Sequence, residues 1–158
     1  MSQKRAIIAM SGGVDSSVAA YIMKKQGYDL KGITLKLYTA EENCLTNEDI
    51  EDAKKVCEKL EIPFEVYNFT DNFKEKVIDK FVRTYEEGGT PNPCIECNRN
   101  IKFGEMLKKA EDLGYEKIAT GHYARVKQDE NGRYLLLRAK DISKDQSYVL
   151  YCLNQEQL

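Results

Sequence analysis

The sequence predicts an α/β fold with a doubly wound, mainly parallel sheet and helices on both of its faces. Short apolar runs alternate with segments of helical periodicity along most of the 158 residues, and repeated β–α units of this kind build parallel sheets. A second observation is the turn at 11–13, where Ser-Gly-Gly joins the first apolar run to the first helical segment. A strand, a glycine turn and a helix N-terminus together form a site for phosphate.

The first half of the sequence predicts three strands separated by two helices. Val14 opens a helix after the first apolar run, and Pro63 precedes the third strand. Between 46 and 60 apolar residues recur at the spacing of one helical face, and Thr46 with Asp49 forms a weak capping box. The strands are expected at 6–10, 30–38 and 64–69.

The second half predicts two helices and two strands, followed by a short amphipathic helix at 148–153. One helix begins near Asp71 and carries four side chains on one side: Phe73, Val77, Phe81 and Tyr85. The other runs from Arg99 to Leu113. The strands are expected at 117–126 and 133–139, with a turn at Asn131-Gly132.

Composition describes a soluble globular chain, with 42% hydrophobic and 32% charged residues. No apolar run approaches the ~20 residues that span a membrane, and no signal peptide is visible. We therefore expect a cytoplasmic protein whose five cysteines are reduced thiols, metal ligands or catalytic groups. Residues 1–140 are expected to form one domain, and 141–158 the start of a helix leading to further domains.

The segment AIIAMSGGVDSS at 6–17 is the first candidate site. Its glycines allow close approach of the backbone to phosphate, and the first N–H groups of the helix have no partner inside it. Asp15 suits this site if a Mg²⁺ ion bridges it to phosphate. The segment is neither a Walker loop nor a G-x-G-x-x-G turn. An ordinary strand-to-helix turn is the alternative interpretation.

The segment GGTPNPCIECN at 88–98 is the second candidate site. We expect a shaped loop with Cys94 and Cys97 just before a helix that begins near Arg99. Positive charge there would lower a thiol pKa, so these thiols would attack electrophiles, carry sulfur or bind metal. A third metal ligand would be Cys44 or a cysteine beyond residue 158.

Other candidates have simpler interpretations. Cys57 and Cys152 lie in apolar helical patterns and are expected to pack. His122 ends a strand on the ligand side of the sheet, so structural and substrate-contacting roles both stay open. Residues 144–147 would be an ordinary capped helix start.

Four motifs occur in this order: SGGVDS, TPNPCIECN, ATGHYARV and KDQSYVLY. Together they resemble the N-terminal part of the tRNA-specific 2-thiouridylase family, which belongs to the ATP pyrophosphatase (PP-loop) superfamily. The resemblance extends over essentially the whole chain. It implies an adenine nucleotide alpha hydrolase-like, Rossmann-like fold, and the use of ATP and Mg²⁺. It also implies tRNA as the substrate: ATP adenylates the C2 oxygen of the wobble uridine, and sulfur then displaces AMP.

The resemblance also implies residue roles. ATP would contact Ala9, Met10, Ser11, Gly12, Gly13, Val14, Asp15, Ser16, Leu35 and Gly121. The target base would meet Asn92, Pro93 and Cys94, and tRNA would also contact His122, Lys144, Asp145 and Gln146. Cys97 matches the nucleophilic cysteine. Many members have Asp at the position of Cys94, so a general acid/base role does not transfer to that thiol.

The family's second essential cysteine lies downstream of residue 158, so we expect this chain alone to leave thiolation incomplete. Sulfur would arrive through a persulfide relay, or on an iron–sulfur cluster held by Cys94, Cys97 and the missing cysteine. The donor would be a cysteine desulfurase, a relay protein or sulfide. Two alternatives stay open: an amide-forming PP-loop synthetase, and a nucleotide- or metal-binding module without turnover.

Overall fold

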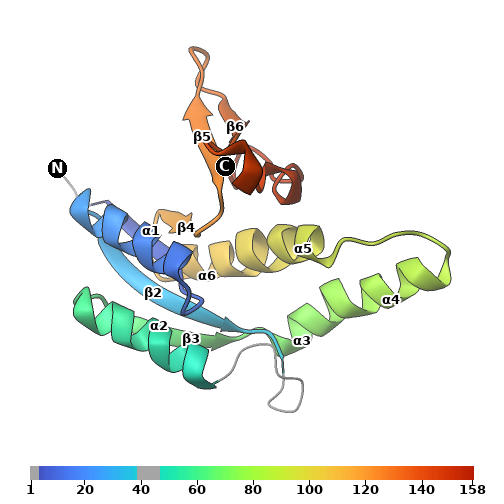
Figure 1. Ribbon diagram of the computed structural model, residues 1–158, viewed down its shortest axis with the longest axis horizontal. Helices are drawn as coiled ribbons and strands as arrows, with labels where there is room; N and C mark the ends of the chain where they lie inside the picture. Colours follow the sequence, from blue (N-terminus) through green and yellow to red (C-terminus); the bar gives the residue numbers. More distant parts are fainter. Residues whose placement is uncertain (1–3, 39–46) are drawn as a thin grey trace.

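A parallel four-stranded sheet forms the centre of the protein (Figure 1). The computed structural model describes residues 4–38 and 47–158. The strand order is β3-β2-β1-β4, and the bounds are β1 Arg5–Ala9, β2 Asp29–Lys36, β3 Phe64–Asn68 and β4 Lys117–Ala119. The three strands expected in the first half are thereby confirmed.

The chain reverses its direction across the sheet between β1 and β4. From β1 it moves outward through β2 to β3, and it then returns to place β4 on the other side of β1. In the parallel register Ile8 pairs with both Gly32 and Ala119. Such a switch point leaves a crevice at the carboxyl ends of β1 and β4, where doubly wound sheets bind ligands.

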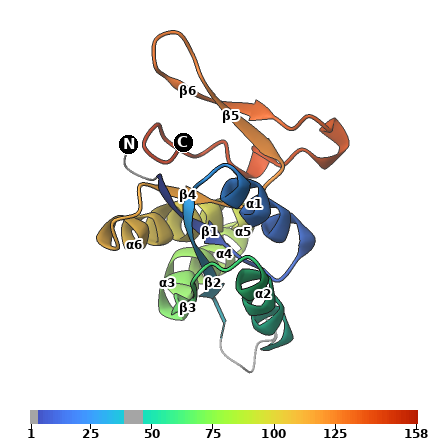
Figure 2. The same cartoon turned by 90° about the vertical axis from the view of Figure 1, so that its left-hand side faces the viewer.

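Helices cover both faces of the sheet, as expected (Figure 2). α1 (Val14–Lys25) and α2 (Asn47–Lys59) lie on one face. The opposite face carries two continuous helical stretches, each with a π-helical part. Their segments are α3 Thr70–Phe73, η1 Lys74–Ile78 and α4 Asp79–Glu86, then α5 Pro93–Glu96, η2 Cys97–Glu105 and α6 Met106–Asp112. Within 4–38 and 47–158, no helix is long and apolar enough to cross a membrane.

The core is divided between the two faces by the alternation of β1. Ile7 packs with the α3–η1 and η2–α6 side, and Ile8 packs with the α1–α2 side. Both side chains are fully buried because helices cover both faces of the sheet. A strand in this position is therefore apolar throughout. Cys57 of α2 lies in the second cluster, which confirms its packing role. The capping box at Thr46 falls outside the described residues, as does Cys44.

The cysteine segment is helical from Pro93 onward, so the expectation of a loop up to Arg99 is wrong. Asn92 is the N-cap, and its side chain accepts a hydrogen bond of 3.1 Å from the amide of Cys94. Pro93 takes the first helical position, where it lacks only an N–H that would have no partner there. Both cysteines therefore stand on a helix.

The strand expected at 117–126 is two strands. β4 ends at Ala119, and after the turn at 120–123 the chain enters β5 (Ala124–Gln128). β5 pairs antiparallel with β6 (Tyr134–Arg138) in a hairpin that projects from the sheet (Figure 1). The interruption lies at the crevice, where the backbone leaves the main sheet.

The expectation of a helix at 148–153 is also wrong. Apart from two short 3₁₀ turns, η3 (Ile142–Lys144) and η4 (Ser147–Val149), the end of the chain has turns and no regular helix. Val149 and Leu150 pack against Phe103, and the side-chain amide of Asn98 donates to the Val149 carbonyl at 2.9 Å. These contacts with η2 give the segment apolar packing and a hydrogen-bond partner without a longer helix.

Candidate functional site

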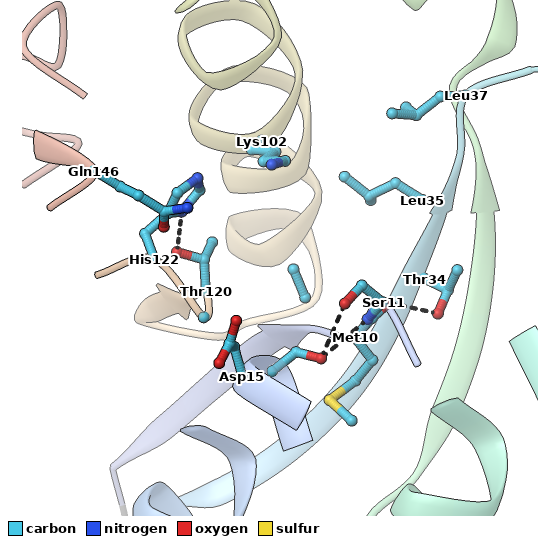
Figure 3. A pocket seen from close by; sticks show the side chains of 13 residues that line it. Met10, Ser11, Asp15, Thr34, Leu35, Leu37, Lys102, Thr120, His122 and Gln146 are labelled. Atoms are coloured by element: carbon cyan, nitrogen blue, oxygen red, sulfur yellow. Dashed lines mark hydrogen bonds between the residues drawn. The ribbon is translucent and has the colours of Figure 1, made fainter. Parts of the chain in front are cut away.

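A cavity of about 280 Å³ opens at the switch point. The ends of β1, β2 and β4 contribute to it, as do the start of α1, helix η2 and the chain around 146 (Figure 3). The residues that line it are Ala9, Met10, Ser11, Asp15, Ser16, Thr34, Leu35, Leu37, Lys102, Thr120, Gly121, His122 and Gln146. Of the ten residues expected around a nucleotide, Gly12, Gly13 and Val14 do not line it.

The loop between β1 and α1 is organised by its serine hydroxyls. Ser16 Oγ donates to the Gly13 carbonyl at 3.1 Å and accepts from the amide of Ser11 at 3.2 Å. The hydroxyls of Ser11 and Ser16 are 3.2 Å apart. Gly13 is the N-cap of α1 and has no side chain to cap the helix. The first amides of α1 are thus oriented for an anionic ligand at the positive end of the helix dipole.

Gly12 is required by both conformation and space. Its φ is +78°, and a Cβ there would lie 2.6 Å from the carbonyl oxygen of Asp49. A side chain at this position would displace the loop, so glycine is needed for its shape although it does not line the cavity.

Hydrogen bonds with β2 fix the beginning of the loop between β1 and α1. The hydroxyl of Thr34, which is 1% exposed, donates to the Met10 carbonyl at 2.8 Å. The amide of Met10 donates to the Ile33 carbonyl at 2.7 Å. Leu35, the next residue of β2, lines the apolar side of the cavity. The family resemblance implies Leu35 but not Thr34, because only the strand register reveals that Thr34 faces the loop.

The turn after β4 packs directly on the start of α1. A Cβ at Gly121 would lie 2.8 Å from the amide nitrogen of Ser16, so only glycine permits this approach. The hydroxyl of Tyr123 donates to Oδ1 of Asp15 at 2.7 Å, and this bond raises the pKa of Tyr123. The carboxylate of Asp15 therefore stands at the mouth of the cavity with a defined orientation.

His122 faces the cavity in its neutral form. Burial, and secondly the charge of Lys102, lowers its pKa to about 4. Its Nδ1 is 2.7 Å from the hydroxyl of Thr120, and its ring packs near that of Phe103. A neutral imidazole held in this way can donate or accept a hydrogen bond but carries no charge at physiological pH.

The residues expected at 144–146 have three different environments. Gln146 lines the cavity, and its side-chain oxygen accepts from the amide of Tyr123 at 2.9 Å. Asp145 accepts from the amide of Ala139 and from the hydroxyl of Ser147, both at 2.7 Å. The Ala139 amide contributes most to the lowered pKa of Asp145. Asp145 thus organises its own turn, whereas Lys144 is exposed.

Neither cysteine of the C-x-x-C pair lines the cavity. Cys94 is exposed and Cys97 is buried. We expected a lowered pKa for these thiols, but at Cys97 burial raises it, against a smaller opposing effect of the Lys102 charge. The expectation for Cys97 is wrong because the helical start draws this side chain into the core.

Asn92 and Pro93 line a second hollow, of about 270 Å³, between their segment and helix α4. Phe81 and Tyr151 contribute aromatic rings to it. The residues predicted to meet a base therefore border a partly aromatic hollow that is separate from the cavity at the switch point.

Metal donors are sparse in the part of the chain that the structure describes. No three His, Cys, Asp or Glu side chains there come together as a metal site. The described residues alone thus do not fit an iron–sulfur cluster. Asp15 does fit a single Mg²⁺ ion shared with a ligand's phosphates, because a carboxylate oxygen is the ligand that this ion prefers.

Residues 4–158 match the family described as tRNA methyl transferase HUP domain. The chain belongs to this family. Curated relatives are similar across nearly all of the chain: the tRNA-specific 2-thiouridylase MnmA of Clostridium acetobutylicum is 55% identical over 98% of it, and that of Clostridium beijerinckii 51% over 99%. The match covers 45% of each relative. The chain thus spans less than half their length.

Two solved structures share the HUP domain fold. One is a predicted subunit of tRNA methyltransferase from Methanocaldococcus jannaschii, with a TM-score of 0.51, 20% identity and coverage of 82% of this chain and 60% of that one. The other is a glutamine-dependent NAD⁺ synthetase from Acinetobacter baumannii, with a TM-score of 0.55, 16% identity and coverage of 76% and 22%. At these identities the likeness concerns the fold alone.

Proposed function

We propose that the chain is the nucleotide-binding region of a tRNA-specific 2-thiouridylase. It binds ATP at the switch point, adenylates the C2 oxygen of the wobble uridine of tRNA, and prepares that carbon for sulfur. The observation that carries the proposal is the 51–55% identity to MnmA over almost the entire chain. The likeness to NAD⁺ synthetase does not favour an amide-forming reaction, because it concerns the fold alone.

The cavity suits the nucleotide half of this reaction. The first turn of α1 offers amide donors to phosphate, and the hydroxyls of Ser11 and Ser16 hold the adjoining loop in shape. Leu35 and Leu37 offer apolar contact to the adenine. Asp15 would hold Mg²⁺ against the phosphates, and the ion would supply neutralisation of charge on the leaving pyrophosphate.

The second hollow suits the acceptor half. Asn92 and Pro93 border it, and the exposed thiol of Cys94 follows them on the same helix. A flipped uridine would stack on aromatic rings of the kind found there. Cys97 is assigned the nucleophilic role, with sulfur from a cysteine desulfurase, a relay protein or sulfide. Its burial means that tRNA binding must expose it before it reacts.

A chimaera tests this function. Residues 1–158 replace the matching segment of the Clostridium acetobutylicum MnmA, and the chimaera is expressed in cells that lack their own enzyme. We expect 2-thiouridine in tRNA by nucleoside mass spectrometry, and none with the Cys97→Ser chimaera. A folded chimaera that binds ATP but produces no 2-thiouridine would contradict the proposal.

A further inference from the structure

Lys102 reaches the cavity from the wall that faces the Ser11–Ser16 loop (Figure 3). It comes from η2, whereas the loop comes from β1 and α1. Among the described residues that line the cavity, it is the one lysine or arginine, and Asp15 is the one acid. Neither the sequence motifs nor the expected nucleotide contacts included Lys102.

The ammonium group of Lys102 has no partner in the described part of the chain. The neighbouring lysines on this side of the sheet do have partners: Lys80 pairs with Glu96 at 2.8 Å, and Lys108 with Glu105 at 3.9 Å. Lys102 is half-buried. A partly desolvated cation without a counter-charge is unfavourable, so its position is explained by an anion that enters the cavity.

The π-helical winding of η2 helps to direct this side chain. In an α-helix, residues i and i+5 point in directions that differ by about 140° around the helix axis. In a π-helix, where residue i+5 is hydrogen-bonded to residue i, the two directions are much more similar. Lys102 is five residues after Cys97, and both lie within η2. Ile101 and Phe103, the residues on either side, are anchored in different apolar clusters. The backbone at 102 is thereby fixed.

The charge of Lys102 also acts on its surroundings. It contributes to the lowered pKa of His122 and opposes the effect of burial on the pKa of Cys97. The ammonium therefore lies close enough to both His122 and Cys97 for its charge to act on them. Because His122 is neutral, it neither repels Lys102 nor supplies a counter-charge to it.

We infer that Lys102 binds the phosphate chain of the nucleotide from the side opposite the Ser11–Ser16 loop. The inference rests on the proposed function, and it adds a substrate-binding residue to it. Phosphate oxygens would supply the missing counter-charge through charge-assisted hydrogen bonds. The loop and Lys102 would then enclose the phosphates between the N-terminus of α1 and a cation on η2.

Calorimetric titration of the 158-residue protein with Mg²⁺–ATP and with adenosine tests this. Lys102→Met keeps most of the apolar stem and removes the charge, and Lys102→Arg keeps the charge. Lys108→Met is the matched control on the adjoining helix, since its exposed ammonium lies outside the cavity. We expect Lys102→Met to weaken ATP binding about ten- to a hundredfold, and adenosine binding not at all. Lys102→Arg should regain most of the loss.

The outcomes separate this inference from the proposed function. If the wild-type protein binds ATP and Lys102→Met binds it equally well, the role of Lys102 is overturned and the proposed function stands. An equal loss for ATP and adenosine would show a damaged cavity and would also overturn the role. A wild-type protein that fails to bind ATP contradicts both proposals.

Discussion

The hydroxyl of Tyr123 donates a hydrogen bond of 2.7 Å to Oδ1 of Asp15. The two residues are 108 positions apart in the sequence, and they join the turn after β4 to the first turn of α1. Tyr123 is in turn held by Gln146, whose backbone amide donates to its carbonyl at 2.9 Å. The carboxylate proposed to hold Mg²⁺ is thus connected to the segment proposed to contact tRNA.

Removal of the Asp15 carboxylate tests its proposed role. We expect Asp15→Ala to weaken Mg²⁺–ATP binding about tenfold or more, since a charge-assisted contact is lost. Binding measured in EDTA should change much less, because no ion then needs the carboxylate. Isothermal calorimetry measures both. Asp71→Ala, at an exposed helix start, is the control. Unchanged affinity with Mg²⁺ would reject the assignment of Asp15.

The buried bond from Thr34 to the Met10 carbonyl predicts a loss of stability. Thr34→Val keeps the shape of the side chain but removes the donor, so we expect the free energy of unfolding to fall by about 1–3 kcal/mol. Urea denaturation followed by circular dichroism measures the change. Thr84→Val is the control, because Thr84 donates to the Lys80 carbonyl at 2.8 Å near the surface. If both variants lost equal stability, burial would not explain the effect.

Local patterns were sufficient to predict the sheet and the loop. β1 is apolar on both faces and ends at Ser-Gly-Gly, so strand, turn and helix follow from adjacent residues. The order of β–α units also predicts that the loop at 11–16 and the residues at 120–122 lie at the carboxyl ends of parallel strands, whereas the switch point, made by the pairing of β1 with β4, needed the structure. Gly121 was assigned to the nucleotide site from the family motif, and its close approach to Ser16 is visible only in the fold.

Long-range contacts account for what the sequence did not predict. Lys102 and Thr34 belong to ordinary helix and strand patterns, and only the packing of η2 and the register of β2 place them at the cavity. The helix at Pro93 was missed because two prolines and two glycines were interpreted as a loop. In fact Asn92 and Pro93 form a favourable helix start.

The neutral state of His122 predicts how stability depends on pH. Its pKa is lowered from 6.5 to about 4 in the folded protein, so between these values the unfolded state binds the extra proton. The free energy of unfolding therefore falls as pH decreases from 6.5 towards 4 and this contribution then levels off. We expect a loss on the order of 2 kcal/mol, reduced by the exposed part of the ring.

His122 is the one histidine of the chain, so its imidazole signal in an NMR titration needs no assignment. The pKa read from that signal should be well below 6.5. The wild type and His122→Gln are compared by urea denaturation between pH 7 and pH 4.5, about the range of the pKa shift. The difference between the two proteins separates the contribution of His122 to the pH dependence of stability from that of the carboxylates. Parallel pH profiles for the two proteins would contradict the prediction.

The different burial of Cys94 and Cys97 predicts different thiol reactivity. Cys94 is exposed, whereas Cys97 is 9% exposed and burial raises its pKa. Because the thiolate is the reactive form, iodoacetamide should alkylate Cys94 at least about tenfold faster, as peptide mass spectrometry would show. Unfolding in urea should make the two rates similar. Faster alkylation of Cys97 in the folded protein would mean that its helix opens without tRNA, and the proposed exposure of this thiol on tRNA binding would then be wrong.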